Sequence, residues 1–455
     1  MIYTIKSIFF LGIKGVAMAN LAVILKKMGK NVSGVDIEEE FITDKLLKEN
    51  NIQFQTNFDN LPKDIDLFVY SAAHQGLKNP LLLKAKEKNI RVISQIELIN
   101  EIMKQFSLKI AVSGCHGKTT TSSLLSYCLI KLFQKPSYLV GVPYFKNNKN
   151  EYQGADFQEK KYFVLEADEY GMAPPIDKTP KLLKINPDWI INTNIDFDHP
   201  DVYQDIEDVK KTFLKFFEDK NLIINVDNEN TTSILNKIKA KKIITYGFSK
   251  KADYQVADWK VNQECSWFKI KNLGEFKISL FGVHNILNAT AVIVFLLNLG
   301  FSIEKIKEAI KDFLGAKRRL ELVKKTNEYM IFDDYAHHPE EIKKTILAIK
   351  ERFKNKRLIL IFQPHTYSRT ASLIKEFRES LSLADFCFVL PIFASAREKK
   401  EDFNISSKDI VFDKKNLIYV EDEIQLNSQL HFILKKGDVI MTMGAGDVYK
   451  LKIKN

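Results

Sequence analysis

The chain reads IAVSGCHGKTTT from Ile110 to Thr121, an apolar strand that passes through a glycine turn into a helix opening with Lys-Thr-Thr. Gly114 and Gly117 allow backbone N–H groups to converge on phosphate oxygens at a positive helix N-terminus. Lys118 adds a positive charge toward the β- and γ-phosphates, and the hydroxyl of Thr119 can hold Mg²⁺. This stretch therefore predicts a phosphate-binding loop with ATP as its ligand.

The predicted loop departs from the complete G-x-x-x-x-G-K-T pattern, since Val112 stands where the first glycine belongs. A plain strand-to-helix turn would also accept small residues, but it has no use for the Lys-Thr pair. We therefore retain the phosphate-binding interpretation, with Cys115, His116 and Thr120 as further members of the loop.

The composition is that of an ordinary globular protein with more than one domain. The chain has 455 residues, 45% of them hydrophobic and 27% charged, and one hydrophobic core rarely serves so long a chain. The formal net charge is +11, but the lysines are scattered, so we expect small anionic substrates and no nucleic-acid partner. The cysteines lie far apart, which argues against a zinc site or a disulfide framework.

Sequence signals for a membrane span or for export are also lacking. The longest apolar stretch, 289–299, is too short to cross roughly 30 Å of hydrocarbon. The apolar run at 8–13 has only strand length, and no small-residue cleavage site follows it. We therefore expect a cytoplasmic protein without a membrane partner, present as a monomer or a weak homodimer.

The order of predicted elements indicates an α/β fold with three domains. Strands alternate with helices, an order typical of mostly parallel sheets. We expect an N-terminal Rossmann-like domain at 1–104, a central P-loop ATPase with a mostly parallel sheet at 105–316, and a C-terminal Rossmann-like domain at 317–455. Between Lys250 and Phe281 the pattern favours a small antiparallel patch. The predicted strands include 7–11, 31–36, 67–70, 162–166, 189–194, 222–226, 330–334, 358–362 and 386–390, and the predicted helices include 16–28, 80–88, 289–299, 340–353 and 372–383.

The N-terminal domain opens with a βαβ unit that could bind a nucleotide. Gly12 and Gly15 fall in the turn after the first strand, and Asp36 ends the second strand, about where an acid reads a ribose. The spacing G-x-x-G is not the dinucleotide pattern G-x-G-x-x-G, so a ligand site and a plain turn both stay open.

Two groups of polar side chains follow strands of the central domain. Glu166, Asp168 and Glu169 end an apolar strand on the side where open α/β sheets hold ligands, and a divalent ion on ATP needs carboxylates there. The segment from Asn192 to His199 could complete a second metal site. We favour metal binding over the alternative of a solvated acidic loop.

Further polar residues flank the boundary to the C-terminal domain. His284, Asn285 and Asn288 open a long apolar helix, where they could read an adenine edge or only cap the helix. The paired arginines Arg318 and Arg319 could deliver positive charge to a phosphate across a closing cleft, or form a solvated basic hinge. Beyond them, the segments 333–339 and 363–369 place polar groups after two predicted strands.

Taken in order, the segments SGCHGKTTT, EADE, NIDFDH, GVHNILNA, KRRLE, DDYAHHPEE, FQPHTYSRT and MGAGD resemble the Mur ligase family over essentially the whole chain. The resemblance implies a UDP-N-acetylmuramate-binding N-terminal domain, a central ATPase and a C-terminal domain for the incoming amino acid or peptide. GxxGxxM, TNID and FQPHTYSRT are most like the members that add L-alanine in peptidoglycan precursor synthesis. EADEY, FDHPDVY and RRLE are closer to members that attach the murein tripeptide L-Ala-D-Glu-meso-diaminopimelate, so this acceptor is the alternative.

The resemblance also implies roles for single residues. Lys118, with Mg²⁺ held by Thr119, Glu166 and His199, would offset the repulsion between ATP and an attacking carboxylate. Lys14 stands where the alanine-adding members usually have glycine, so its effect on UDP binding stays open. The other implied contacts are those of Arg319 and Asp334 with the nucleotide, of His284, Asn285 and Asn288 with adenine, of Gly12, Gly15, Asp36 and Ser71 with the UDP-sugar, and of Tyr335, His337, His338 and Arg369 with the carboxylate or the amino acid.

Two other functions remain open from the sequence. A folyl-polyglutamate or cyanophycin type of ligase would share the phosphate loop and the acids but not the N-terminal GIKGVAM block. A non-enzymatic ATP-dependent conformational switch would need only the phosphate loop and the hinges between domains.

Overall fold

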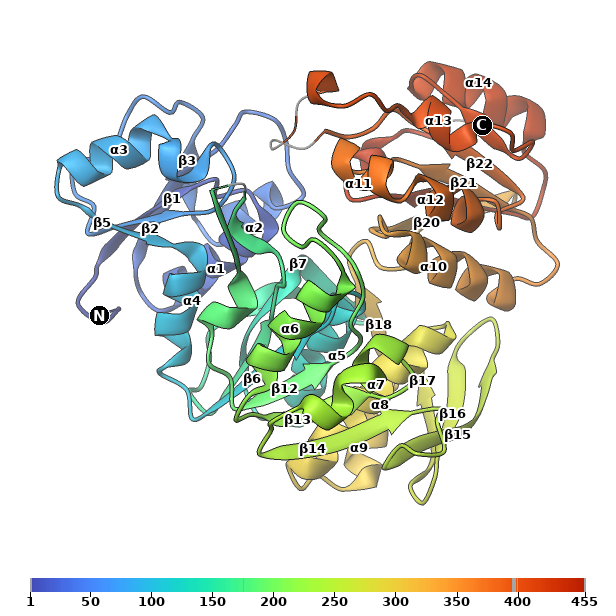
Figure 1. Ribbon diagram of the computed structural model, residues 1–455, viewed down its shortest axis with the longest axis horizontal. Coiled ribbons are helices and arrows are strands. Elements are labelled where there is room, and N and C mark those ends of the chain that lie inside the picture. Colours follow the sequence, from blue (N-terminus) through green and yellow to red (C-terminus); the bar gives the residue numbers. More distant parts are fainter. Residues whose placement is uncertain (1, 175, 395–397, 399, 454–455) are drawn as a thin grey trace. The chain divides into compact units, whose positions relative to one another are not determined.

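The computed structural model describes residues 2–174, 176–394, 398 and 400–453 (Figure 1). By contacts, the chain divides into two compact units, each of which is described by itself. The first unit runs to Trp259 and includes Phe268–Ile278 and Leu287–Ala316, and the second holds Lys260–Trp267, Ser279–Ile286 and the chain from Lys317 onward. The domain boundaries after residues 104 and 316 remain predictions.

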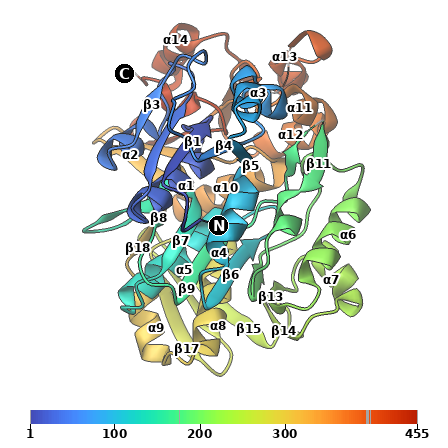
Figure 2. The same cartoon turned by 90° about the vertical axis from the view of Figure 1, so that its left-hand side faces the viewer.

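A parallel sheet with the order β3-β2-β1-β4-β5 forms the N-terminal part of the first unit (Figure 2). Its strands are buried on both faces, because Ile8 and Phe10 pack into one core cluster and Phe9 and Leu11 into another. This order corresponds to the first five strands of the Rossmann order 3-2-1-4-5-6, so the predicted Rossmann-like N-terminal fold is confirmed. The elements are β1 Ser7–Leu11, α1 Val16–Lys27, β2 Asn31–Val35, α2 Asp44–Glu49, β3 Gln53–Gln55, β4 Leu67–Tyr70, α3 Pro80–Glu87, β5 Arg91–Ser94 and α4 Gln95–Met103.

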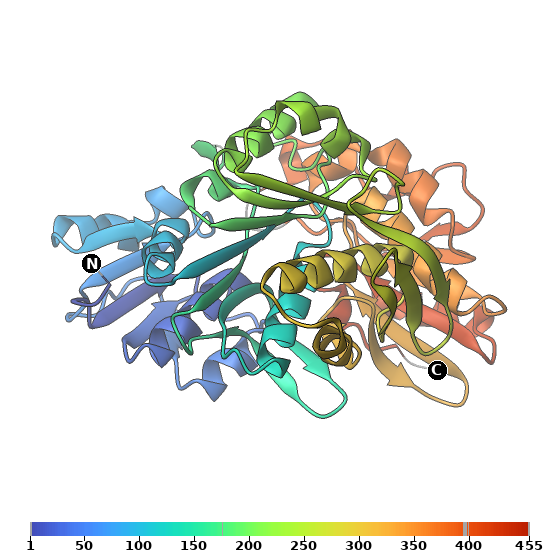
Figure 3. The same cartoon turned by 90° about the horizontal axis from the view of Figure 1, so that it is seen from below.

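An 11-stranded sheet follows, with the order β17-β16-β15-β14-β13-β12-β6-β9-β7-β18 and β8 paired to β7. The pairs from β15 through β6 and β9 to β7 are parallel, whereas β8 and β18 pair with β7 antiparallel, so the predicted mostly parallel sheet is confirmed. Figure 3 shows this sheet running from turquoise to yellow-green strands. Its central strands β6, β9 and β12 end side by side, because Ser113 pairs with Asn192 and Val112 with Glu166. Polar residues after these strands therefore meet at one edge.

The bounds of the elements in this region are β6 Leu108–Ser113, α5 Lys118–Lys131, β7 Ser137–Asn147, β8 Glu151–Asp156, β9 Tyr162–Glu166, β10 Gly171–Ala173, β11 Asp177–Pro180, β12 Trp189–Asn192, α6 Ile206–Phe217, β13 Asn221–Asn225, α7 Glu229–Ile234, β14 Lys242–Gly247, β15 Tyr254–Val261, β16 Ser266–Ile270, β17 Gly274–Ile278, α8 Val283–Asn298, α9 Ile303–Ile310 and β18 Phe313–Ala316. Strands β10 and β11 form a separate antiparallel pair.

The C-terminal sheet has the order β19-β20-β24-β21-β22-β23 and is parallel except for the β19–β20 pair. Alternate residues cover its two faces: Phe332 and Leu360 pack with α10 and α12, whereas Ile331 and Ile361 pack with α14. The predicted Rossmann-like C-terminal fold is confirmed. Its elements are β19 Glu321–Lys325, β20 Tyr329–Asp334, α10 Pro339–Arg352, β21 Leu358–Phe362, α11 Tyr367–Ser372, α12 Ile374–Leu381, β22 Phe386–Val389, α13 Ser407–Val411, β23 Leu417–Tyr419, α14 Glu423–Ile433 and β24 Asp438–Met443.

Two predicted helices differ from the observed ones. The helix predicted at 289–299 begins already at Val283, because its polar first turns continue the helix ahead of the apolar run. The helix predicted at 372–383 is observed as α12 over Ile374–Leu381, whereas the short helix α11 before it was not predicted; the two are separated at Leu373, whose φ of −123° leaves the helical region. Among the residues that the structure describes, no helix is both long and apolar enough to cross a membrane.

Candidate active site

The predicted phosphate loop lies between the end of β6 and the start of α5, at the carboxyl edge of the central sheet. Gly114 and Gly117 have φ values of 126° and 82°, in the region that favours glycine. A Cβ at Gly114 would collide with Thr193, and a Cβ at Gly117 would lie 2.8 Å from Asn288 Oδ1. Both glycines are therefore required by backbone conformation and by close neighbours.

Residues that follow β12 brace the phosphate loop from the side. Asn194 Oδ1 accepts a hydrogen bond from His116 N at 3.0 Å, and Asn194 Nδ2 donates to His116 O at 2.8 Å. Thr193 Oγ1 donates to the same carbonyl at 2.6 Å. Asp196 contacts the His116 ring at 3.0 Å and the thiol of Cys115 through its backbone. The first half of the segment that the sequence suggested as a second metal site thus fixes the loop.

Lys118 forms a buried ion pair with Glu169. Its Nζ donates to both carboxylate oxygens, at 2.9 and 2.8 Å, and to Gly114 O at 2.6 Å. Burial raises the pKa of Glu169 to about 7, although the Lys118 ammonium opposes this shift. Burial by itself would lower the pKa of Lys118, but the Glu169 carboxylate holds it above its usual range. The cation that would meet the γ-phosphate is therefore charged and already oriented.

Glu166 lies at the end of β9 between two hydrogen-bond donors. Thr119 Oγ1 donates to its Oε1 at 3.1 Å, and the backbone N–H of Gly141 donates to its Oε2 at 2.8 Å. Thr119 belongs to the first turn of α5, so its hydroxyl and the Glu166 carboxylate lie at the N-terminus of this helix. Mg²⁺ binds hydroxyl and carboxylate oxygens, so these two side chains fit as its ligands.

His199, the third predicted metal ligand, lies beside Glu169 and Asp168. Its Nε2 is 3.7 Å from Glu169 Oε1, and its ring packs on Tyr170 with 4.7 Å between centroids. Ligand atoms of His199, Glu169 and Asp168 all lie within 4.8 Å of one another. The structure therefore joins Thr119 to Glu166, and His199 to the neighbouring acids.

The predicted adenine-binding residues lie along α8. Asn288 abuts Gly117 of the phosphate loop. Asn285 donates from Nδ2 to Phe281 O at 3.0 Å, a bond within the helix start. Burial lowers the pKa of His284 to about 4, with Lys344 adding to the shift, so this imidazole is neutral near pH 7.

The predicted UDP-sugar residues come together at the carboxyl edge of the N-terminal sheet. Asp36 is buried, and its Oδ1 lies 3.0 Å from His74 Nε2. A Cβ at Gly12, whose φ is 79°, would lie 3.2 Å from the His74 ring and 3.5 Å from Ser71 Oγ. Gly15 forms the N-cap of α1. His74 is a member of this cluster that the sequence analysis did not identify.

Lys14 turns its side chain away from this cluster. Its Nζ donates to Glu39 O at 2.9 Å and lies 3.5 Å from Asp44 Oδ2, over the ring of Phe54. Its backbone N–H donates to Asp36 Oδ2 at 2.7 Å. The lysine therefore occupies the interior of the N-terminal domain, and its backbone makes the contact that orders Asp36.

The two arginines at the start of the second unit have different environments. Arg318 is buried, bonds Asp333 at 2.9 Å and donates to the carbonyls of Gly444 and Gly446. Its charge is used inside the C-terminal fold, so the suggestion that both arginines meet a phosphate is wrong for Arg318. The guanidinium of Arg319 lies 4.9 Å from the centroid of the Tyr335 ring.

Asp334 closes the turn that holds these arginines. Its carboxylate accepts backbone N–H groups from Leu320 at 2.7 Å and from Ala336 at 2.8 Å. Burial raises its pKa to about 6, against the opposing charge of Arg319. Asp334 thus orders the backbone around Arg319.

The remaining predicted residues cluster at the carboxyl edge of the C-terminal sheet. The rings of Tyr335 and His337 lie 5.5 Å apart, and those of His337 and His365 lie 5.9 Å apart. Arg369 Nη1 is 3.4 Å from His365 Nδ1. His338 instead caps α10 with its ring. The cluster combines a cation, imidazoles and a phenol, which can orient a carboxylate.

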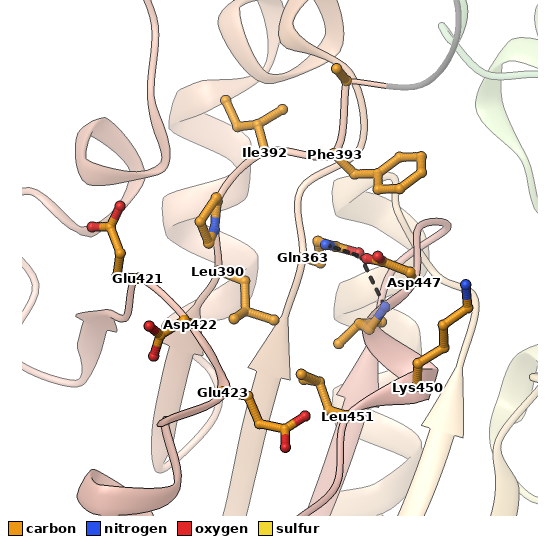
Figure 4. A pocket seen from close by; sticks show the side chains of 13 residues that line it. Gln363, Leu390, Ile392, Phe393, Glu421, Asp422, Glu423, Asp447, Lys450 and Leu451 are labelled. Atoms are coloured by element: carbon orange, nitrogen blue, oxygen red, sulfur yellow. Dashed lines mark hydrogen bonds between the residues drawn. The ribbon is translucent and has the colours of Figure 1, made fainter. Parts of the chain in front are cut away.

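A cavity of about 400 Å³ lies beside this cluster at the ends of β21, β22 and β24 (Figure 4). Gln363 is one of its lining residues; it donates to Asp447 at 2.8 Å and accepts from Val448 N at 3.2 Å. Among the described residues, its lining includes Glu421, Asp422, Glu423 and Asp447 but one lysine, Lys450, and none of the predicted site residues. This excess of carboxylates does not suit a phosphate or a carboxylate ligand.

Sequence reasoning placed Glu169 among three acids that could bind a divalent ion and selected Glu166 as the metal ligand, but it did not predict the ion pair of Glu169 with Lys118. Glu169 was visible as one of three neighbouring acids, yet nothing in the sequence indicated which acid would meet Lys118. Gly141 was missed, because a lone glycine within a strand carries no signal of a partner in another strand.

Three descriptions of protein families match the chain. "Mur ligase family, catalytic domain" matches residues 7–107, "Mur ligase middle domain" matches 112–296, and "Mur ligase, glutamate ligase domain" matches 318–446. Together they span the N-terminal sheet, the central sheet with the phosphate loop, and the C-terminal sheet.

Several relatives are similar over nearly the full length. The UDP-N-acetylmuramate–L-alanine ligase of Caldanaerobacter subterraneus subsp. tengcongensis is 37% identical over 98% of this chain and 96% of its own. The ligase of that name from Lactobacillus acidophilus is 37% identical over 98% and 97%.

Two solved structures share the fold over 98% of this chain and 97% of their own. The UDP-N-acetylmuramate-alanine ligase MurC of Thermotoga maritima has a TM-score of 0.80 at 24% identity. The murein peptide ligase of Psychrobacter arcticus has a TM-score of 0.76 at 22% identity. At these identities the likeness concerns the fold.

Proposed function

Because this chain belongs to the Mur ligase family, we propose that it joins L-alanine to UDP-N-acetylmuramate in peptidoglycan precursor synthesis, with cleavage of ATP to ADP and phosphate. The observation that carries the proposal is the phosphate loop, in which Lys118 is held by Glu169 and Thr119 by Glu166. The alanine-ligase names of relatives that match 98% of the chain support the choice of acceptor.

In the first step, the lactyl carboxylate of the sugar attacks the γ-phosphorus of ATP. An O–P bond forms, the bond to the β-phosphate oxygen breaks, and ADP leaves with that electron pair. Two anions must approach each other, so a fixed cation at the γ-phosphate lowers the barrier. Lys118 supplies this charge without rearrangement, because Glu169 and Gly114 already orient its ammonium group.

Glu169 can adapt when the ammonium group of Lys118 is shared with the phosphate. Burial raises the pKa of Glu169 to about 7, so the carboxyl can take up a proton when its cationic partner is shared with ATP. The site therefore need not hold an unpaired buried charge during turnover.

Mg²⁺ would be held by Thr119 and Glu166, with the neighbouring acids and His199 within reach of a second position. When bound, this ion neutralises the charge that develops on the β- and γ-phosphate oxygens.

In the second step, the amine of alanine attacks the acyl phosphate. A C–N bond forms, the C–O bond to phosphate breaks, and the amine gives up a proton. Tyr335, His337 and Arg369 are the groups that we assign to the amino acid, because Arg369 can pair with its carboxylate and the imidazole can receive a proton. Arg319, which lies beside Tyr335, is the residue that we assign to the nucleotide.

The proposal is tested by ADP and phosphate release from the purified chain with ATP, Mg²⁺ and UDP-N-acetylmuramate. L-Alanine, L-serine, glycine and L-Ala-D-Glu-meso-diaminopimelate are compared as acceptors. We expect turnover with alanine. Turnover with the tripeptide alone would assign the chain to the recycling of peptidoglycan peptides. ATP binding without amide formation would support the alternative of a non-enzymatic conformational switch.

The reaction uses a nucleotide sugar and ATP, so we assign it to the cytoplasm. Membership in the family argues against a switch without catalysis. The N-terminal cluster around Asp36, with the match to residues 7–107, argues against a folate or cyanophycin type of substrate.

A further inference from the structure

A buried asparagine links the first helix of the chain to strand β7 of the central sheet. Asn20 lies in the second turn of α1 and is fully buried. Its Nδ2 donates to Val140 O and to Val142 O, both at 2.8 Å. Helix α1 packs against β7 and β8, as Figure 2 shows. One side-chain amide therefore serves two carbonyls of the same strand.

The strand needs these donors because its pairing is interrupted there. Between Leu139 and Tyr144 the register of β7 against β8 shifts, so the carbonyls of this bulge do not follow the regular ladder. A Cβ at Gly154 of β8 would overlap Val142 O and lie 2.7 Å from Asn20 Nδ2. The bulge is thus built around the asparagine amide.

The residue between the two carbonyls holds Glu166. In an extended strand, neighbouring residues point their backbone groups to opposite sides. The carbonyls of Val140 and Val142 face Asn20, and the N–H of Gly141 donates to Glu166 Oε2 at 2.8 Å on the other side. A Cβ at Gly141 would lie 2.6 Å from Glu166 Oε1, so the carboxylate rests directly on this backbone.

Asn20 is not needed merely to attach the N-terminal domain. Other contacts join the same two parts, among them Lys27 with Asp156 at 2.7 Å and the Tyr144 hydroxyl with Glu49 at 2.7 Å. Asn20 Oδ1 is buried and has no hydrogen-bond partner among the described residues. A buried oxygen without a partner lowers the stability of the fold, so an apolar side chain would serve better if packing were the only role of this residue.

From this geometry we propose that Asn20 is a positioning residue for the metal-binding carboxylate of Glu166. It fixes Val140 and Val142, which hold the Gly141 N–H in place. That N–H engages Glu166 Oε2, which leaves Oε1 directed toward Thr119, its proposed partner in holding Mg²⁺. The inference rests on the proposed function, in that it takes Glu166 as a ligand of Mg²⁺.

Helix α1 also connects Asn20 with the turn assigned to the UDP-sugar. The helix begins directly after Gly15, the last residue of the turn assigned to the UDP-sugar. Asn20 follows within two helical turns, so a shift of the turn moves the asparagine with it. The same helix therefore connects the nucleotide-sugar turn with the carboxylate that serves ATP.

The test compares metal binding in three forms of the full chain: wild type, Asn20→Ala and Asn416→Ala. Asn416 is the matched control, because its Nδ2 also bridges two carbonyls, Ser382 O and Ala384 O, in the C-terminal domain. Binding of Mn²⁺·ATP is measured by electron paramagnetic resonance, and the Mg²⁺ requirement by the KM for Mg²⁺.

For Asn20→Ala we expect the dissociation constant of Mn²⁺·ATP and the KM for Mg²⁺ to rise up to about tenfold, the lower end of the effect of losing an outer-shell partner, because Asn20 only positions the Gly141 N–H that is this partner. The KM for L-alanine should not change. Hydrogen exchange of the Gly141 amide should become faster. Asn416→Ala should lower the unfolding temperature without altering metal binding. Equal metal affinity in wild type and Asn20→Ala would overturn the proposal.

A double substitution separates positioning from general loosening of the structure. In a Glu166→Gln background, Asn20→Ala should cause no further loss of Mn²⁺ affinity, because the carboxylate through which Asn20 acts is gone. Independent, additive losses would contradict the proposal.

Two milder changes keep the test informative if Asn20→Ala folds poorly. Asn20→Ser retains one donor and should give an intermediate affinity. Gly141→Ala puts a methyl group where the Glu166 carboxylate lies and should reproduce the metal defect with α1 unchanged. Normal metal affinity in Gly141→Ala would overturn the proposal.

Failure of this inference can be told from failure of the proposed function. The Mn²⁺·ATP measurement requires neither the nucleotide sugar nor an amino acid. A wild-type chain that does not bind Mn²⁺·ATP would contradict the proposed function, whereas a wild type that binds and ligates, with an unaffected Asn20→Ala, would contradict only the role of Asn20.

Discussion

The ion pair of Lys118 with Glu169 makes the loop lysine part of the folded structure as well as of the site. Both groups are shielded from solvent, and the side chain of Glu169 is only 2% exposed. Removing one member of a buried pair leaves the other charge without compensation, which costs more than the pair itself contributes. Substitutions of Lys118 therefore change stability together with activity.

For Lys118→Met we expect loss of most turnover and a fall in the free energy of unfolding of about 3–5 kcal/mol, because Glu169, buried without its cation, must take up a proton that a solvated carboxyl does not bind near pH 7. Adding Glu169→Gln should restore most of the stability but not the turnover. Urea unfolding and phosphate release measure the two effects. A Lys118→Met chain as stable as wild type would contradict this account.

His284 should make stability depend on pH. Its pKa is lowered by burial from 6.5 to about 4, so between these values the unfolded chain binds more protons than the folded one. The contribution of the neutral imidazole is therefore fully present above pH 6.5 and is lost as the pH falls toward 4.

This dependence can be measured by urea unfolding of wild type and His284→Gln from pH 7 to pH 4.5. The variant should lose less stability than wild type over this interval. His431→Gln, a change at an exposed histidine, is the control and should follow wild type. Equal slopes for His284→Gln and wild type would rule out a buried neutral imidazole.

At the level of residues, the sequence predicted chemical types better than partners. Lys118, Thr119 and Glu166 were selected because phosphate and metal chemistry requires those groups, and the structure brings them together. Arg318 carries the same guanidinium group as Arg319, yet it forms an ion pair with Asp333, which lies 15 residues away in sequence. Such pairing depends on tertiary structure, and no local pattern encodes it.

The element that does most to hold the phosphate loop is the segment after β12. Asn194 bonds both the N–H and the carbonyl of His116, so it acts on the loop as a neighbouring strand would. The loop is thus fixed before ATP arrives, and less conformational entropy is lost on binding.

For Asn194→Ala we expect the KM for ATP to rise about tenfold, because two hydrogen bonds of about 1 kcal/mol each no longer order the loop. The KM for L-alanine should remain near its wild-type value. Asn221→Ala is the control, since Asn221 bonds Asp188 O at 3.1 Å at the opposite edge of the sheet. An unchanged KM for ATP in Asn194→Ala would show that the loop orders itself.

Strands were predicted more accurately than helix ends. The bounds of β1, β9 and β21 match the predicted ones, because apolar runs bounded by turns define a buried strand. The bulge in β7 was not predicted, because it depends on Asn20 of a distant helix.

At the scale of the whole chain, the three main sheets with their helices follow from the alternation of strands and helices. The make-up of the compact units does not. Phe281 precedes the predicted C-terminal domain, yet it packs in one core cluster with Phe332 and lies 3.8 Å from the guanidinium of Arg352. A sequence pattern shows where a sheet begins, but it does not show which preceding segments of the chain pack into the core of that sheet.

The cysteines give the molecule a further property. All four are buried and free. Burial raises the pKa of Cys115, Cys128 and Cys387, and only the thiolate form attacks alkylating reagents. Alkylation of the native chain must therefore wait for transient opening. Cys115 lies in the phosphate loop and Cys387 in β22. The labelling rate at each thiol therefore reports how often the structure around that thiol opens.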